Sequence, residues 1–149
     1  MNVLVDFWQN SPFATALIGW FIAQLIKVVL VLITNKKLDM SRFIGSGGMP
    51  SSHTALVCSL TTAIGYDEGF SSSIFALSAV FSLVVMYDAA GVRRAAGQQA
   101  KILNLIIEDW GKKPYAETGK KLKELLGHTP KEVFAGAILG IAIGIIRHI

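Results

Sequence analysis

The sequence predicts an all-α fold, a polytopic membrane helical bundle of about four transmembrane helices plus a cytoplasmic amphipathic helical loop. Hydrophobic residues make up 52% of the 149 residues. Charged residues make up only 16%, whereas about 25% is usual in soluble domains. The apolar residues also gather in runs that are separated by short polar segments. We therefore expect a single integral-membrane domain over residues 1–149, which the length also favours.

The first apolar run, residues 13–33, is long enough to cross a hydrocarbon core about 30 Å thick. Gln24 and Lys27 interrupt this run and share one helical face. A lysine at that depth is costly unless it snorkels or faces a polar interior. Two interpretations of Lys27 therefore stay open: it snorkels toward the interface, or it points at the same site as His53.

The second helix is expected from Ser51 to about Tyr66, and the third from a cap at Ser71 to Tyr87. The second is short for a membrane span and rich in serine and threonine, so neighbouring helices should shield it. An acidic turn at residues 67–69 separates the two helices.

Small residues and residues that favour helix continue beyond the third helix, over residues 88–108. We expect this stretch to extend past the membrane or to run along its surface. Residues 111–114 break it, and a basic amphipathic helix is expected over residues 115–126. Gly127 ends that helix as a C′ residue would.

A last apolar helix is expected over residues 131–146, opened by Thr129 and Pro130. Its glycines recur at a spacing that favours close helix packing: Gly136, Gly140 and Gly144. With the small size of the chain, this glycine face also indicates a homodimer.

Basic residues gather in two of the connecting segments, residues 35–46 and 93–131, whereas the turn between the second and third helices is acidic. The positive-inside rule therefore places both basic loops on the cytoplasmic side of the cell membrane and both termini outside. The net charge of +4 is modest, so no nucleic-acid partner is expected.

One stretch organises the chain: a glycine-rich loop from Gly45 runs into Pro50, Ser51, Ser52 and His53, where the second helix begins. Backbone N–H groups in a first helical turn have no intrahelical partner, and the helix dipole adds partial positive charge there. Such a helix start accepts an anion, most readily a phosphate. The alternative is an ordinary capped helix with a histidine in its first turn.

Four spans would bring the loop before His53, the end of the third helix and the segment around His128 to one membrane face. Both histidines would then lie near a set of basic side chains, and arginine binds phosphate oxygens in a bidentate manner. The basic candidates for phosphate binding are Lys27, Lys36, Arg42, Arg93 and Arg94.

His128 and Glu132 stand four residues apart. A carboxylate at that spacing can accept from one ring nitrogen and make the other a better nucleophile. Alternatively, Glu132 reaches back to Thr129 in a capping box.

Three motifs resemble the divergent membrane branch of the type-2 phosphatidic acid phosphatase superfamily, which also contains the vanadium haloperoxidases. They read Gly-Gly-Met-Pro-Ser-Ser-His-Thr, Tyr-Asp-Ala-Ala-Gly-Val-Arg-Arg and Leu-Gly-His-Thr-Pro-Lys-Glu-Val-Phe-Ala-Gly. The resemblance covers nearly the whole chain, and the motifs recur in the same order.

The resemblance implies roles for several residues. His53 matches the general acid of a Pro-Ser-Gly-His motif in which Ser52 replaces the glycine. His128 matches the nucleophile, and Glu132 matches the carboxylate that orients it. Ser51 and Ser52 would contribute to phosphate binding at the start of the helix.

Two of the superfamily's motifs are missing. No Lys-x6-Arg-Pro exists, and Lys27, Lys36 and Arg42 are candidates for its role. No Ser-Arg precedes His128 at the expected distance, so Arg93 and Arg94 are candidates for the missing arginine.

The resemblance therefore implies a metal-independent phosphatase, without cofactors, that acts on a lipid phosphate or lipid pyrophosphate. The alternative is a non-catalytic membrane protein that binds lipid phosphate or a partner. A third hypothesis has Asp88, His53, His128 and Glu132 hold a divalent metal.

Overall fold

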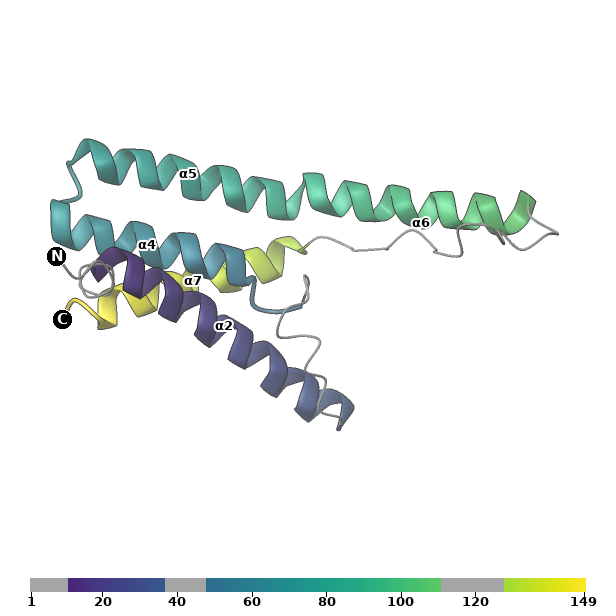
Figure 1. Cartoon of the computed structure of the whole chain (residues 1–149), viewed down its shortest axis with the longest axis horizontal. Helices are drawn as coiled ribbons and strands as arrows, with labels where there is room; N and C mark the ends of the chain where they lie inside the picture. Colours follow the sequence, from purple (N-terminus) through teal and green to yellow (C-terminus); the bar gives the residue numbers. More distant parts are fainter. Residues whose placement is uncertain (1–10, 37–47, 111–127) are drawn as a thin grey trace, which may run out of the picture.

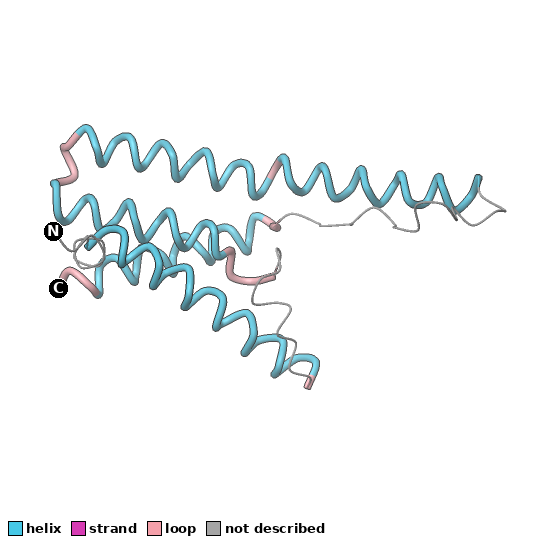
Figure 2. Tube along the Cα trace, viewed as in Figure 1, coloured by secondary structure: helices cyan, strands magenta, loops and turns pink. Residues whose placement is uncertain are grey.

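The structure is a computed structural model that describes residues 11–36, 48–110 and 128–149. Within these residues the chain forms helices and no strands (Figure 2), as the sequence predicts. The helices are α2 (Ser11–Asn35), α4 (Ser52–Glu68), α5 (Ser73–Ala90), α6 (Val92–Trp110) and α7 (Pro130–Ile146). An all-α membrane bundle is therefore the fold of this protein.

Helix α4 is the centre of the bundle, because α2, α5 and α7 all pack against it. Helices α2, α4, α5 and α7 run in alternating directions, so the starts of α4 and α7 lie at the same end as the end of α5 (Figure 1). Helix α6 continues almost in line with α5 and projects beyond the bundle, while the far end of α2 diverges from α4 and α7.

Glycines allow α7 and α2 to approach α4 closely. A Cβ atom on Gly140 would lie 2.6 Å from the carbonyl oxygen of Ala55, and one on Gly136 would lie 2.5 Å from that of Ser51. A Cβ on Gly19 of α2 would overlap the hydroxyl of Ser59. The glycine face of α7 thus packs against α4 of the same chain. It therefore does not support a homodimer, which stays a prediction.

The interior is lined by small and hydroxyl-bearing residues that bond across helices. Ser59 Oγ donates to the carbonyl of Gly140 on α7 at 3.1 Å, and Ser82 Oγ of α5 donates to that of Val57 at 3.1 Å. The outer face of α5 is instead apolar, and its large side chains are more than half exposed: Leu77, Val80, Phe81, Leu83 and Val84. Small residues inside and large apolar residues outside are the pattern expected of a bundle surrounded by lipid.

Two stretches of the described chain are long and apolar enough to cross a membrane, judged by length and composition. They are Ser11–Thr34, with 24 residues, and Ser73–Ile106, with 34 residues. Helices α4 and α7 have 17 residues each, about 25 Å in length, which is shorter than a hydrocarbon core of about 30 Å. That α4 and α7 also cross stays a prediction.

The third helix begins one residue later than expected. The N-cap is Ser72, whose Oγ accepts from the Phe75 N–H at 3.2 Å, and not Ser71. Sequence alone does not separate two adjacent serines, because either can cap. The amphipathic helix expected over residues 115–126 and its end at Gly127 lie outside the described residues.

We expect Gly140→Ala to destabilise the bundle. Alanine has a higher helix propensity by about 1 kcal/mol, but the added methyl group would meet main-chain atoms of α4 that cannot rotate away. Overpacking of this kind costs about 1–3 kcal/mol, so the net change should lower the midpoint of thermal unfolding in detergent. Ile138→Leu, at an exposed position on the same helix, should leave that midpoint unchanged. A variant Gly140→Ala that unfolds at a higher temperature than the wild type would contradict the close contact.

Candidate functional site

The start of α4 follows the predicted order of loop, cap and helix. Ser51 is the N-cap, and its Oγ accepts from the backbone N–H of Thr54 at 3.4 Å and from the Thr54 hydroxyl at 3.0 Å. Gly48, just before it, has a φ of 87°, which a glycine adopts without strain. Ser51 and Ser52 are both buried, whereas His53, in the same first turn of α4, is exposed.

The start of α7 satisfies both interpretations of Glu132 at once. Thr129 Oγ1 accepts from the Glu132 N–H at 3.4 Å, and Glu132 Oε2 accepts from the Thr129 N–H at 3.3 Å, which completes a capping box. The same Oε2 lies 2.9 Å from Nδ1 of His128. An ionised carboxylate only accepts hydrogen bonds, so Nδ1 is the donor. In the neutral ring, Nε2 then carries the lone pair.

A main-chain hydrogen bond joins the two helix starts. The Ser51 N–H donates to the carbonyl oxygen of Glu132 at 2.9 Å, and Gly136 lies directly against the Ser51 carbonyl. This contact brings His128, just before α7, next to the first turn of α4, although His53 and His128 stand 75 positions apart in the chain.

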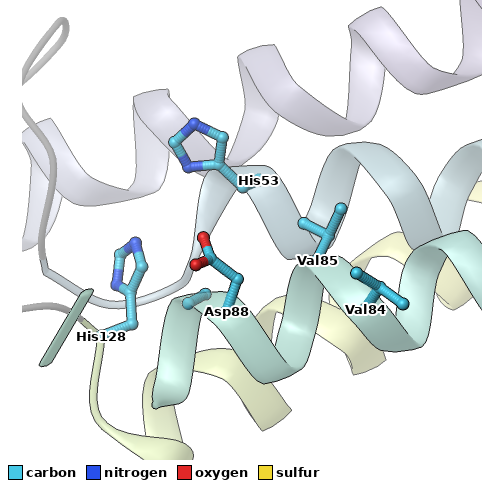
Figure 3. A pocket seen from close by; sticks show the side chains of 6 residues that line it. His53, Val84, Val85, Asp88 and His128 are labelled. Atoms are coloured by element: carbon cyan, nitrogen blue, oxygen red, sulfur yellow. The ribbon is translucent and has the colours of Figure 1, made fainter. Parts of the chain in front are cut away.

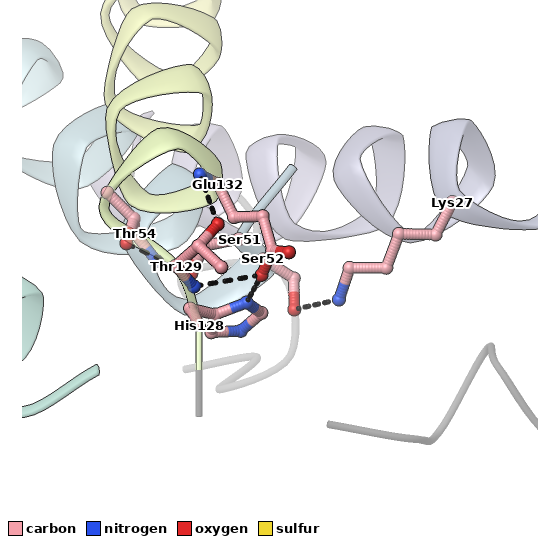
Figure 4. A network of polar contacts seen from close by, with 7 residues as sticks. All are labelled: Lys27, Ser51, Ser52, Thr54, His128, Thr129 and Glu132. Atoms are coloured by element: carbon pink, nitrogen blue, oxygen red, sulfur yellow. Dashed lines mark hydrogen bonds and ion pairs between the residues drawn. The ribbon is translucent and has the colours of Figure 1, made fainter. Parts of the chain in front are cut away.

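Lys27 points inward from α2 and does not snorkel. Its side chain is 3% exposed, and Nζ donates to Ser52 Oγ at 3.1 Å. Figure 4 shows Lys27 reaching from α2 to Ser52, with the His128–Glu132 pair close by. The Glu132 carboxylate also attracts the ammonium group electrostatically. One turn earlier, the buried Oε1 of Gln24 has no hydrogen-bond partner among the described residues.

His53 and His128 line one cavity of about 320 Å³, a volume within the usual range of ligand sites. Val84, Val85, Asp88 and Ala89 of α5 form another part of its wall. Figure 3 shows the Asp88 carboxylate directed toward the space between the two imidazole rings. The prediction from sequence included Asp88 only as part of a metal site, although it stands inside one of the three motifs.

Among the described side chains, Lys36 is a further basic candidate, and it is not part of these contacts. Lys36 is exposed at the diverging end of α2, with a φ of 52°. Arg93 and Arg94 lie in the first turn of α6, shortly after Asp88, but their side chains, like the whole of Arg42, lie outside the described residues. In the part of the chain that is described, no three His, Cys, Asp or Glu side chains form a group that could hold a metal ion.

Comparison with known proteins places these features in a wider context. A family model described as "Divergent PAP2 family" matches residues 8–143. The chain is 43% identical over 152 residues to the uncharacterized membrane protein YuiD of Bacillus subtilis (strain 168), and the match covers 95% of this chain and 96% of that protein. No solved structure matches the chain.

The two functions of Glu132 can be separated by mutation. Thr129→Ala removes the N-cap, which typically costs about 1 kcal/mol, but it leaves the carboxylate next to His128. Glu132→Ala removes both. We expect both variants to unfold at lower temperature than the wild type, and only Glu132→Ala to change the ¹⁵N NMR shifts of His128 toward a mixture of tautomers. The same tautomer shift in Thr129→Ala would contradict the role of Glu132 as the direct partner of the ring.

Proposed function

Because this chain belongs to the divergent PAP2 family, we propose that it is a phosphatase that removes phosphate from a lipid phosphate or lipid pyrophosphate. The observation that carries the proposal is the pair of histidines: His128, oriented by Glu132 at 2.9 Å, and His53 share one cavity. The reaction needs a nucleophile, an acid for the leaving group and cations for the phosphate oxygens.

In the first step Nε2 of His128 attacks phosphorus in line with the ester oxygen. A nitrogen–phosphorus bond forms as the phosphorus–oxygen bond to the lipid breaks. Glu132 accepts the hydrogen bond from Nδ1 and stabilises the positive charge that develops on the ring. His53 donates a proton to the departing alcohol oxygen. In a pyrophosphate the leaving group is instead the lipid monophosphate.

In the second step a water molecule attacks the phosphohistidine. His53, now without its proton, takes a proton from the water as the nitrogen–phosphorus bond breaks. Inorganic phosphate leaves, and both histidines return to their starting states. Asp88 is directed toward the space between the two rings.

Holding the phosphate requires more positive charge than the described side chains supply. Near the cavity, Lys27 is accompanied by two carboxylates, Glu132 and Asp88. The first turn of α4 adds backbone N–H groups. We assign the remaining charge to Arg93 and Arg94, which follow Asp88 in the chain, with Arg42 as a further candidate.

The proposal includes a multi-pass arrangement in the cell membrane with the site on the cytoplasmic side. Its support is the uneven distribution of charge along the sequence, since the segments 35–46 and 93–131 are basic, whereas Asp67 and Glu68 stand at the end of α4 that lies away from the site.

A non-catalytic protein that binds lipid phosphate is the second candidate. The absence of the Lys-x6-Arg-Pro and Ser-Arg motifs from the sequence favours it, because binding alone needs no nucleophile.

Purified protein should release phosphate from a lipid phosphate, and vanadate should inhibit the release. His128→Asn keeps an N–H group for Glu132 but removes the nucleophile, so phosphate release should fall on the order of 10³-fold or more. His148→Asn is the matched control, because His148 lies at the opposite end of the bundle against Ser11 and Asp67.

Wild-type protein given a labelled substrate should yield phosphohistidine at position 128. Lipid phosphate binding without turnover and without phosphohistidine would establish the binding protein instead.

His53 can be tested through the leaving group. For an alkyl phosphate, His53→Asn should lower the rate by about 10²–10⁴-fold, which is the usual contribution of a general acid. For p-nitrophenyl phosphate the loss should be much smaller, since nitrophenolate departs without a proton. Equal losses for the two substrates in a rate comparison would rule out the role of His53 as the acid.

A further inference from the structure

We propose that Lys27 is a positioning residue for His128: its buried ammonium group balances the charge of the Glu132 carboxylate, which holds the imidazole in place. From sequence, Lys27 is a candidate ligand of the phosphate. It is not, however, among the described residues that line the cavity between His53 and His128. The inference rests on the proposed function for the role of His128 as nucleophile, but the effect of Lys27 on the imidazole can be tested without turnover.

Lys27 is held in a buried position between α2 and α4. Its side chain is 3% exposed, and Nζ donates to the Ser52 hydroxyl at 3.1 Å in a buried hydrogen bond. Gly48 adjoins the aliphatic part of the side chain, because a Cβ on this glycine would lie 4.0 Å from Lys27 Cδ. A cation that is removed from water needs an anion nearby, since an unpaired buried charge is strongly destabilising.

Glu132 of α7 provides that anion, because its carboxylate attracts the Lys27 ammonium group electrostatically. Both residues are anchored at the start of α4. Lys27 bonds to the side chain of Ser52, and the main-chain carbonyl of Glu132 accepts from the Ser51 N–H at 2.9 Å. Figure 4 shows the His128–Glu132 pair close to the contact between Lys27 and Ser52. A cation from α2 and a carboxylate from α7 therefore act on each other where three helices meet.

The same carboxylate holds His128. Glu132 Oε2 lies 2.9 Å from His128 Nδ1 and 3.3 Å from the backbone nitrogen of Thr129. Electrostatic coupling is reciprocal, so Lys27 also favours the negative charge on Glu132 that accepts the Nδ1–H. Without Lys27, both Glu132 and His128 would bind a proton more readily. A protonated imidazole has no lone pair with which to attack phosphorus.

Other titratable side chains also lie around His128. His53 of α4 and Asp88 of α5 line the same cavity, where they would meet the substrate directly. Lys131 of α7 is exposed. Among the described cations, Lys27 is therefore the one that combines burial with attraction to Glu132.

A ¹⁵N NMR titration of His128 in the full-length protein tests the proposal without substrate. Lys27→Met replaces the ammonium group by an uncharged side chain of similar length, so the midpoint of the titration should move to higher pH by about 0.5–1 unit. Lys27→Arg keeps the charge and should restore the wild-type midpoint. Gln24→Met is the matched control, because Gln24 is also buried on the same face of α2 but carries no charge. It should leave the midpoint unchanged.

A second background tests whether Lys27 acts through Glu132. Glu132→Gln keeps an amide oxygen for His128 Nδ1 but removes the charge, so in this background Lys27→Met should move the midpoint much less. If Lys27→Met does not fold, Lys27→Gln takes its place, since the amide retains an N–H donor without a charge. An unchanged midpoint in the folded uncharged variant, or the same shift in both backgrounds, would overturn the proposal.

Kinetics separate this role from phosphate binding and from the phosphatase itself. In Lys27→Met, kcat on the acid side of the pH profile should fall about three- to ten-fold, while KM for hexadecyl phosphate stays the same. A raised KM with an unmoved pH profile would instead make Lys27 a phosphate ligand and overturn the proposal. A shifted NMR midpoint in a protein that forms no phosphohistidine would support the role of Lys27 and reject the phosphatase. Phosphohistidine formation with an unshifted midpoint would do the reverse.

Discussion

The site depends on the close contact between the first turn of α4 and the first turns of α7. The Ser51 N–H reaches the Glu132 carbonyl at 2.9 Å, and this is sterically allowed because Gly136 has no side chain to hold the helices apart. The contact fixes the position of His128 relative to α4, and with it the cavity that His53 and His128 share. Any side chain at position 136 would therefore alter the candidate site as well as the packing.

Glu132 links folding to chemistry in the same place. Its Oε2 accepts from the Thr129 backbone and from His128 Nδ1, so the atom that caps α7 also sets the orientation of the imidazole. The third histidine has a different environment. His148 Nδ1 contacts the Gly144 carbonyl at 2.7 Å, and its Nε2 lies near Ser11 and Asp67 at the other end of the bundle. Both of its nitrogens serve local structural contacts, whereas His128 lines a cavity.

Small residues fill the interior of the bundle and large apolar residues cover its exterior, as suits a protein surrounded by lipid. Buried positions are occupied mainly by alanine, glycine, serine and threonine, whose hydroxyls bond to carbonyls of neighbouring helices. This arrangement allows short interhelical distances without the hydrophobic driving force that folds soluble proteins. It also leaves the larger apolar side chains to the outer face of the bundle.

The sequence by itself determined the helices of the described residues, to within a few residues at each end, and the cap at Ser51. For Glu132 it left two contacts open, with His128 and with Thr129, and both are present. These features depend on interactions within one or two helical turns, so residue type and spacing suffice to predict them. Only the tertiary structure decided that Lys27 turns inward to Ser52 and that Asp88 lines the same cavity as the two histidines. Each of these depends on how a helix is rotated against its neighbours, and that rotation is set by contacts between residues far apart in the chain.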